Sequence, residues 1–292
     1  MNDPIDVPSA ADGRRWPGDA VAAVSVTMDN MGEAYELESN LWPSGMPIGN
    51  HFSVFRSLPP MLEILQSYNV QVTYFVEAWN TDVYPDTIKD VAARGHEIGL
   101  HGFRHEAWAA LDPEREEELL DVSVRRFREL GINIRGFRPP GGGLNTGTRE
   151  LLAGHGIDYT SPAGEHVVAA DDHVFLPFRW RWIDAYCYFE PLEEMRKADG
   201  RPPGLIDPQG FEEIMEACIG EVIESGGYAS LLFHPFLHDD ADRLAAMRRI
   251  VERISTDSRL WCAPCGEVAE WVRGRPGMFD EDPGLTTQSW MR

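Results

Sequence analysis

Apolar runs alternate with amphipathic segments along most of this chain. Residues 20–29, 70–79 and 96–103 are short apolar segments rich in β-branched and aromatic residues, typical of strands buried on both faces. Between them, residues 59–68 and 84–95 have apolar positions at helical spacing, with proline near the start of each. This alternation predicts βαβ units with parallel strands.

The second half of the chain continues the pattern. Residues 112–131 are the clearest helix, with acidic residues early, arginines late and a closing glycine. Further strands are expected at 173–182 and 228–235, and further helices at 211–227 and 241–255. We expect seven or eight such units, a number at which a parallel sheet can close into a barrel.

The pattern predicts one domain. Residues 1–19 are polar and are interpreted as an N-terminal arm, and residues 20–292 as the α/β barrel domain, because no repeat or composition shift divides them. Residues 30–58 and 185–210 are long connections bearing glycine and proline. In compact domains, connections of this length are often active-site loops.

Composition and charge narrow the function. The 292 residues carry a formal net charge of −22, which argues against nucleic acid or an anionic membrane as a partner. The N-terminus lacks the apolar segment of a secretory signal, and a cytoplasmic location is therefore expected. Cys262 and Cys265 have C-x-x-C spacing without a second pair, which favours free thiols over a zinc site.

Chemically active residues follow several of the predicted strands. The strand ends carry Asp29-Asn30, His101 with His105, Arg138-Pro139, and His234, and the segment 173–182 leads to Asp184. Each has an ordinary alternative: a helix cap, surface histidines, a structural ion pair or a hydrogen-bonded core histidine. Because active sites of parallel α/β folds lie at the carboxyl ends of strands, the joint arrangement favours a catalytic site.

The same residues carry a family resemblance. The motifs "TMDN", "HGFRH", "FRPPGG" and "LLFHP", in this order, resemble those of the polysaccharide deacetylase superfamily, carbohydrate esterase family 4. "WRWIDAYCYF" is similar to a segment of the non-secreted branch, which includes peptidoglycan-deacetylase-like enzymes, cyclic imide hydrolases and allantoin-processing relatives. The resemblance implies a distorted (β/α) barrel and metal-assisted hydrolysis of an amide, commonly an N-acetyl group.

The resemblance also implies roles for individual residues. Asp29 matches the general base, Arg138 the arginine that orients it, and His234 the general acid, while His101 and His105 match metal ligands. A divalent metal is expected, zinc first, with cobalt or manganese as alternatives. Four further residues near this edge are expected to bind substrate: Glu33, Pro139, Trp182 and Asp184.

The chain departs from the family at the third metal ligand. The family usually places a second aspartate next to the base or two residues after it, where this chain has Asn30 and Met31. Asn30 is the candidate third ligand, although its neutral amide oxygen binds a divalent cation less tightly than a carboxylate does. The alternatives are Asp29 or Glu33 as the carboxylate ligand, or a metal-free site.

Three functions remain open from the sequence. The first is N-deacetylation or deacylation of a sugar or a small intracellular amide. The second is ring-opening hydrolysis of a cyclic imide or ureide, and the third is a non-catalytic barrel that binds a ligand. Aromatic residues from Trp180 to Tyr188 suit stacking on a sugar or heterocycle, but are also typical of a core or a subunit interface. The resemblance implies a homo-oligomer.

Overall fold

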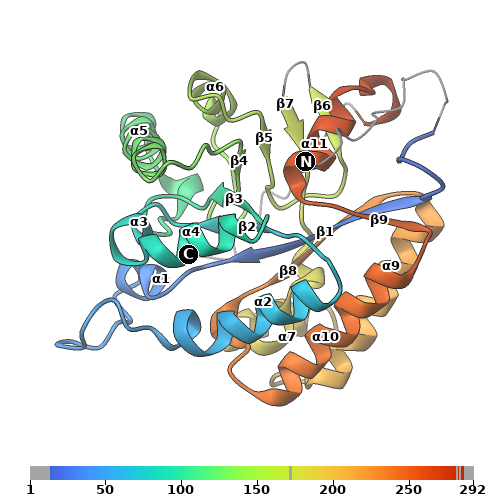
Figure 1. Cartoon of the computed structure of the whole chain (residues 1–292), viewed down its shortest axis with the longest axis horizontal. Helices are drawn as coiled ribbons and strands as arrows, with labels where there is room; N and C mark the ends of the chain where they lie inside the picture. The colour runs from blue at the N-terminus through green and yellow to red at the C-terminus, as the bar shows by residue number, and fades with distance from the viewer. Residues whose placement is uncertain (1–13, 171–172, 281, 283, 286–292) are drawn as a thin grey trace.

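The computed structural model describes residues 14–170, 173–280, 282 and 284–285, which form one domain around a curled, mostly parallel sheet (Figure 1). The strands run in the order β6-β7-β5-β4-β3-β2-β1-β8, and β9 pairs with β1. Every pair is parallel except β6 with β7. The strands are β1 (Ala22–Asp29), β2 (Thr73–Val76), β3 (Glu97–Leu100), β4 (Gly136–Phe137), β5 (Tyr159–Thr160), β6 (Val168–Ala170), β7 (His173–Phe175), β8 (Tyr228–Phe233) and β9 (Leu260–Cys262).

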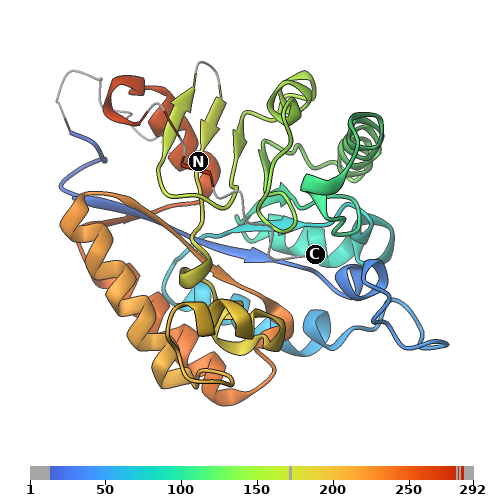
Figure 2. The same cartoon turned by 180° about the vertical axis from the view of Figure 1, so that it is seen from behind.

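Helices surround the sheet. In Figures 1 and 2, α2, α9 and α10 lie together on the side of β8, while α5, α6 and α11 lie on the opposite side. None of the helices in the described part of the chain has both the length and the apolar character that crossing a bilayer requires. The helices are α1 (Ala34–Glu38), α2 (Leu58–Ser67), α3 (Asn80–Val83), α4 (Pro85–Ala93), α5 (Pro113–Glu129), α6 (Thr148–Gly154), α7 (Asp184–Tyr188), α8 (Glu193–Ala198), α9 (Pro208–Ser225), α10 (Ala241–Thr256) and α11 (Cys265–Arg273).

The sheet confirms the predicted distorted (β/α) barrel. It curls around the core, and the segment at Ile183 adds a parallel bridge to Leu232 beyond the edge strand β8. The predicted helix at 112–131 is α5, whose cap residue Asp112 accepts a hydrogen bond from the backbone N–H of Arg115. Local sequence signals therefore position the main elements correctly.

The predicted strand at 173–182 is only partly correct. Strand β7 ends at Phe175, and Trp180–Trp182 form a 3₁₀ turn. Pro177 interrupts the segment because it has no backbone N–H to donate to a sheet. The short strands β5, β6 and β9 were not predicted, since two or three residues are too few to show a period.

Strand β1 lies between β2 and β8 and also pairs with β9, and all eight of its residues are buried. Its buried hydroxyl groups are satisfied: Ser25 donates to the carbonyl oxygen of Ala263, and Thr27 lies 3.2 Å from the hydroxyl of Ser230. The strand is thus held rigidly between its neighbours. Its last residue, Asp29, enters the cavity described below from a fixed backbone.

The predicted N-terminal arm lies mostly in residues 1–13, outside the described part. Trp16, within the predicted arm, is buried against the domain and donates from its indole N–H to the carbonyl oxygen of Gly226. Cys262 and Cys265 are free thiols.

Candidate active site

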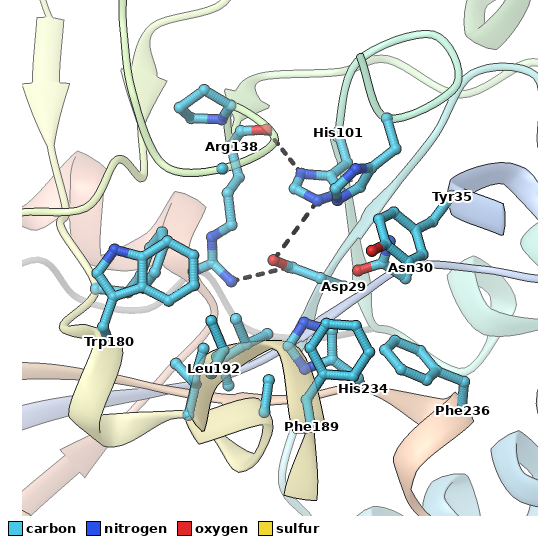
Figure 3. Close-up of a pocket in the computed structure, with 17 residues that line it drawn as sticks. Asp29, Asn30, Tyr35, His101, Arg138, Trp180, Phe189, Leu192, His234 and Phe236 are labelled. Carbon is cyan, nitrogen blue, oxygen red and sulfur yellow. Dashed lines mark hydrogen bonds and ion pairs between the residues drawn. The ribbon is translucent and has the colours of Figure 1, made fainter. Parts of the chain in front are cut away.

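A cavity of about 610 Å³, including its open mouth, lies at the carboxyl ends of the strands (Figure 3). Four strands position its main polar residues. Strand β1 ends at Asp29, while His101 directly follows β3, Arg138 follows β4 and His234 follows β8. Asn30, His105 and Pro139 also line it. The structure therefore brings together seven of the ten residues that the sequence suggested for the site.

Asp29 and Arg138 form a buried ion pair in this cavity. One terminal nitrogen of Arg138 donates to Asp29 Oδ1 at 2.9 Å, and the exposed fractions of these residues are 3% and 0%. Burial raises the pKa of Asp29, while the charges of Arg138 and His234 partly oppose that rise. The second carboxylate oxygen, Oδ2, is left for the cavity.

Arg138 is held on all sides. It donates to the hydroxyls of Thr27, Ser161 and Ser230, and its guanidinium lies 4.3 Å from the ring centroid of Phe75. These contacts keep the side chain in one orientation. Asp29 is therefore positioned by a guanidinium that has little freedom to move.

His101 and His105 lie on a tight loop and not on a helix. The centroids of the two rings are 4.9 Å apart, and the ring planes are inclined at 74°. The loop reverses direction because Gly102 and His105 both adopt left-handed backbone conformations, with φ of 73° and 74°. Such an angle is uncommon for a histidine and marks local strain. Glu106 holds the loop by accepting hydrogen bonds from the backbone N–H groups of Phe103 and Arg104.

Both imidazoles are neutral at physiological pH. Burial lowers the pKa of His101 to about 3 and that of His105 well below its usual value. His101 Nδ1 lies 2.8 Å from the carbonyl oxygen of Arg138, which only accepts, so Nδ1 carries the proton. Nε2 therefore presents a lone pair, and it lies 3.8 Å from Asp29 Oδ2.

Asn30 follows Asp29 with a left-handed backbone, φ 59°, which asparagine tolerates better than most residues. Its side-chain amide donates to Glu77 Oε1 at 3.0 Å, which leaves the amide oxygen as the atom it presents to the cavity. Glu77 is fully buried and also accepts from the backbone of Met31 and the side chain of Asn80. Glu77 thus fixes which way the amide of Asn30 points.

His234 is paired with Asp184, at the start of α7. Asp184 Oδ1 lies 2.6 Å from His234 Nδ1, and its Oδ2 accepts from the backbone N–H of His234 and contacts His238 Nε2 at 3.0 Å. Burial alone would lower the pKa of His234, but the charge and hydrogen bond of Asp184 raise it above the ordinary value. For Asp184 the directions are reversed: burial alone would raise its pKa, but the charges and hydrogen bonds of His234 and His238 lower it to about 2.

Three of the expected substrate-binding residues do not line this cavity. Glu33 is fully buried, where it accepts from the backbone N–H of Gly49 and from the hydroxyl of Tyr84. Trp182 lines a neighbouring surface pocket, and its ring lies 4.2 Å from the guanidinium of Arg179. Asp184 is fully buried, and its carboxylate is bonded to His234. Only Pro139 of this group lies on the cavity wall.

Trp180, one of the aromatic residues expected near this edge, lines the cavity, but the rest of the aromatic wall was missed in the sequence. Phe236 lies two residues after His234, and its ring is 5.5 Å from the imidazole and 5.8 Å from Phe189. Tyr35 completes the rim with its ring 4.9 Å from that of His105. The only sequence signal was their place in the two long connections and beside "FHP", which is too general to identify a wall.

The donor set suits a divalent cation. A neutral imidazole nitrogen and a carboxylate oxygen, both acceptors, face each other at 3.8 Å, and a buried ring nitrogen of His105 has no hydrogen-bond partner. A cation near these atoms would satisfy them. Within residues 14–170 and 173–280, however, no three side chains of the Cys, His, Asp and Glu types gather as a complete metal site. Besides the two imidazoles, a further protein ligand would have to be Asp29 Oδ2 or the neutral amide oxygen of Asn30, because the carboxylate of Glu33 is engaged outside the cavity.

Comparisons with known proteins relate this chain to polysaccharide deacetylases. Residues 55–160 match the polysaccharide deacetylase family model. The chain is 28% identical over 130 residues to a peptidoglycan deacetylase of Helicobacter pylori, covering 44% of this chain and 42% of that protein. It is 29% identical over 166 residues to chitin deacetylase 1 of Saccharomyces cerevisiae, covering 55% and 52%. The chain thus spans about half the length of these curated relatives.

Solved structures cover nearly the whole chain. One from Mycobacterium smegmatis, assigned provisionally to the polysaccharide deacetylases, has 28% identity and a TM-score of 0.80 over 94% of this chain and 96% of that one. An allantoinase with 19% identity has a TM-score of 0.70 over 93% and 98%, a likeness that concerns the fold alone. The fold is therefore shared along the full length of both.

Proposed function

We propose that this chain, whose residues 55–160 match the polysaccharide deacetylase family model, is a hydrolase of carbon–nitrogen amide bonds. The observation that supports the proposal most is the pairing of a buried carboxylate, Asp29, with a histidine that readily holds a proton, His234, across one cavity. Amide hydrolysis needs a group of each kind. In the reaction, water adds to the carbonyl carbon, the C–N bond breaks, and a carboxylic acid and an amine are released.

Asp29 is the proposed general base. Its Oδ1 is occupied by Arg138, so Oδ2 is the oxygen that takes the proton from the attacking water. The raised pKa makes Asp29 a stronger base than an exposed aspartate, while Arg138 keeps enough of it ionised to act. Arg138 is a positioning residue, because its contacts are to Asp29 and to buried hydroxyls.

His234 is the proposed general acid. Its Nδ1 is engaged by Asp184, so Nε2 is the nitrogen that delivers a proton to the departing amine. Asp184 keeps the imidazole oriented and favours its protonated form, which are the two properties that an acid requires. Asp184 is therefore proposed as a positioning residue and not as a substrate contact.

His101 and His105 are the proposed ligands of a divalent cation, zinc first, with Asn30 as the candidate third ligand. Such a cation would polarise the amide carbonyl. Their neutral state, imposed by burial, is the form that binds metals.

Replacing both ligands should remove the metal. The His101→Ala/His105→Ala variant is expected to retain less than about a tenth of the wild-type metal content, because a lone amide oxygen and one carboxylate bind divalent ions weakly. Elemental analysis of protein purified without added metal measures this. His166→Ala, a half-exposed histidine away from the cavity, is the control. Full metal content in the double variant would rule out this assignment.

The pH dependence of catalysis should report on Asp184. As pH rises through the pKa of His234, the acid loses its proton and kcat/KM falls. Asp184→Asn removes the charge that raises that pKa, so the alkaline limb should move to lower pH by about one unit or more. Asp199→Asn, which alters a carboxylate outside the cavity, should leave the profile in place. An unmoved alkaline limb in Asp184→Asn would show that His234 is not the titrating acid.

The proposed function is tested by amine release. N-acetylated sugars, simple N-acyl amines and cyclic imides are offered to the purified protein, and the products are quantified with and without added zinc. Release of an amine from at least one amide supports the proposal, and opening of imides alone assigns the ring-opening alternative. Binding of a compound without turnover of any of them would refute the hydrolase and favour the non-catalytic, ligand-binding barrel.

A further inference from the structure

A second buried histidine, His238, bonds to the carboxylate that holds His234. Asp184 Oδ1 lies 2.6 Å from His234 Nδ1, while Asp184 Oδ2 lies 3.0 Å from His238 Nε2. His238 is fully buried and is not among the residues that line the cavity. Any effect of this imidazole on catalysis must therefore act through Asp184 and not through contact with a substrate.

A short turn places both imidazoles on the same carboxylate. Residues Pro235–Leu237 form a 3₁₀ turn, in which the backbone N–H of Leu237 donates to the carbonyl oxygen of His234 at 2.9 Å. The turn brings His238 back beside His234, four residues earlier. Asp184 reaches both rings from the start of α7, and it is fully buried. The three side chains thus form one buried, hydrogen-bonded unit.

The direction of the hydrogen bond at His238 follows from the geometry. Asp184 Oδ2 accepts from the backbone N–H of His234, a group that can only donate, so His238 Nε2 also donates to this oxygen and carries a proton. His238 Nδ1 is buried and has no hydrogen-bond partner among the described residues. The ring centroids of Tyr188 and Phe233 lie 6.0 and 5.6 Å from that of the imidazole. A second proton at Nδ1 would have no acceptor in these aromatic surroundings, so His238 is neutral.

Packing alone does not explain a histidine at this position. A buried nitrogen without a partner costs free energy that an apolar side chain of similar size, such as methionine, avoids. The imidazole instead supplies a hydrogen-bond donor to Asp184. Burial would raise the pKa of Asp184, but the charges and hydrogen bonds of His234 and His238 hold it at about 2. The ionised carboxylate that orients His234 therefore depends on His238 as well.

We propose that His238 is a further positioning residue, a neutral donor that shares Asp184 with His234 and limits how tightly the carboxylate holds the acid in its protonated form. The proposal rests on the proposed function, since it concerns the proton that His234 delivers. A hydrogen bond from His238 disperses part of the charge of Asp184, so the imidazolium of His234 is stabilised less than it would be by an unshared carboxylate. An acid that holds its proton less tightly transfers it more readily to the departing amine.

Two nearly isosteric replacements isolate the donor. His238→Gln keeps an N–H group that can donate to Asp184, whereas His238→Met has the same side-chain length and no donor. Proton NMR detects the hydrogen-bonded Nδ1–H of His234, which is identified by its upfield shift in Asp184→Asn. In His238→Met this resonance should move downfield, because the carboxylate regains charge and its hydrogen bond with His234 strengthens. In His238→Gln it should stay close to its wild-type position. An unmoved resonance in His238→Met, or equal shifts in both variants, would overturn the proposal.

The pH dependence of catalysis gives a second, independent sign. His238→Met should move the alkaline limb of kcat/KM to higher pH by about half a unit, opposite to the shift expected for Asp184→Asn, because His234 then holds its proton more tightly. If His238 only packed against Asp184, its loss would loosen the carboxylate and move the limb to lower pH, which would contradict the proposal. The other titratable groups that face this unit are unchanged in both variants: Asp29, Arg138, His101 and His105 toward His234, and Cys187 and Tyr188 toward Asp184.

The unmodified protein offers a test that does not depend on the folding of any variant. In heteronuclear NMR of protein with isotope-labelled histidine, His238 should show a protonated Nε2 and a bare Nδ1 near neutral pH. Through-space contacts with the rings of Tyr188 and Phe233 assign its signals. A protonated Nδ1 would overturn the proposal, because the ring would then be a cation and not a neutral donor.

The NMR measurements require no turnover, so they separate this inference from the proposed function. The expected resonances in a protein that hydrolyses no amide would refute the hydrolase and keep the shared carboxylate. Hydrolysis of an amide, together with a His234 resonance that His238→Met leaves unmoved, would refute the role of His238 and keep the hydrolase.

Discussion

Asp29→Asn is expected to lower kcat by about two to four orders of magnitude while substrate binding is largely kept, because the variant loses the proposed general base. The asparagine oxygen still accepts the hydrogen bond that Arg138 donates at 2.9 Å. Steady-state kinetics on any amide that the wild type hydrolyses measures the change. A loss in kcat with little change in KM distinguishes a missing base from a damaged pocket.

The stability of this variant needs its own measurement. Arg138 is fully buried, and removing its ionised partner leaves a buried guanidinium with only neutral partners, which should lower the melting temperature. Assays are therefore run well below that temperature. Near-normal turnover would mean that another group is the base. Glu33 is a poor substitute, because its carboxylate is engaged by Gly49 and Tyr84 outside the cavity.

Above the pKa of about 8 to which burial raises Glu77, Asn30→Asp is expected to destabilise the protein by about 2–4 kcal/mol, and a second change, Glu77→Gln, should restore most of the loss. The aspartate would place a carboxylate oxygen where the amide of Asn30 now donates to Glu77 Oε1, so two buried acceptors would meet at about 3 Å. In the double variant the glutamine amide donates to the new carboxylate. Its oxygen still accepts from Met31 and Asn80.

Chemical unfolding of the wild type, both single variants and the double variant gives a double-mutant cycle, which measures the coupling energy between residues 30 and 77. Zinc titration of the same four proteins shows the consequence for the site. The double variant should bind zinc most tightly, because it alone adds a second carboxylate, at position 30, without the opposing charge of Glu77. If the effects of the two single changes on stability simply add, Glu77 does not fix the orientation of the side chain at position 30. Zinc affinity equal in wild type and the double variant would show that residue 30 is not a ligand.

Much of the site was accessible to sequence reasoning because strand ends are local features. Asp29, His101, Arg138 and His234 each follow an apolar run, and parallel strands bring their carboxyl ends to one edge without any knowledge of side-chain packing. The same reasoning assigned Glu33 to substrate binding on proximity in sequence alone. Its side chain turns away into a buried hydrogen bond with Tyr84, which only long-range packing decides.

The amino-acid sequence by itself determined the main strands and helices, the edge where the polar residues meet and the absence of a second carboxylate beside Asp29. Periodicity, turn residues and strand ends are properties of neighbouring residues, so they can be recognised in the sequence. The tertiary structure alone decided the pairing of Asp184 with His234, the hold of Glu77 on Asn30 and the aromatic wall beside the acid. Each joins segments some fifty residues apart or drawn from separate loops, and no local pattern records which side chains meet there.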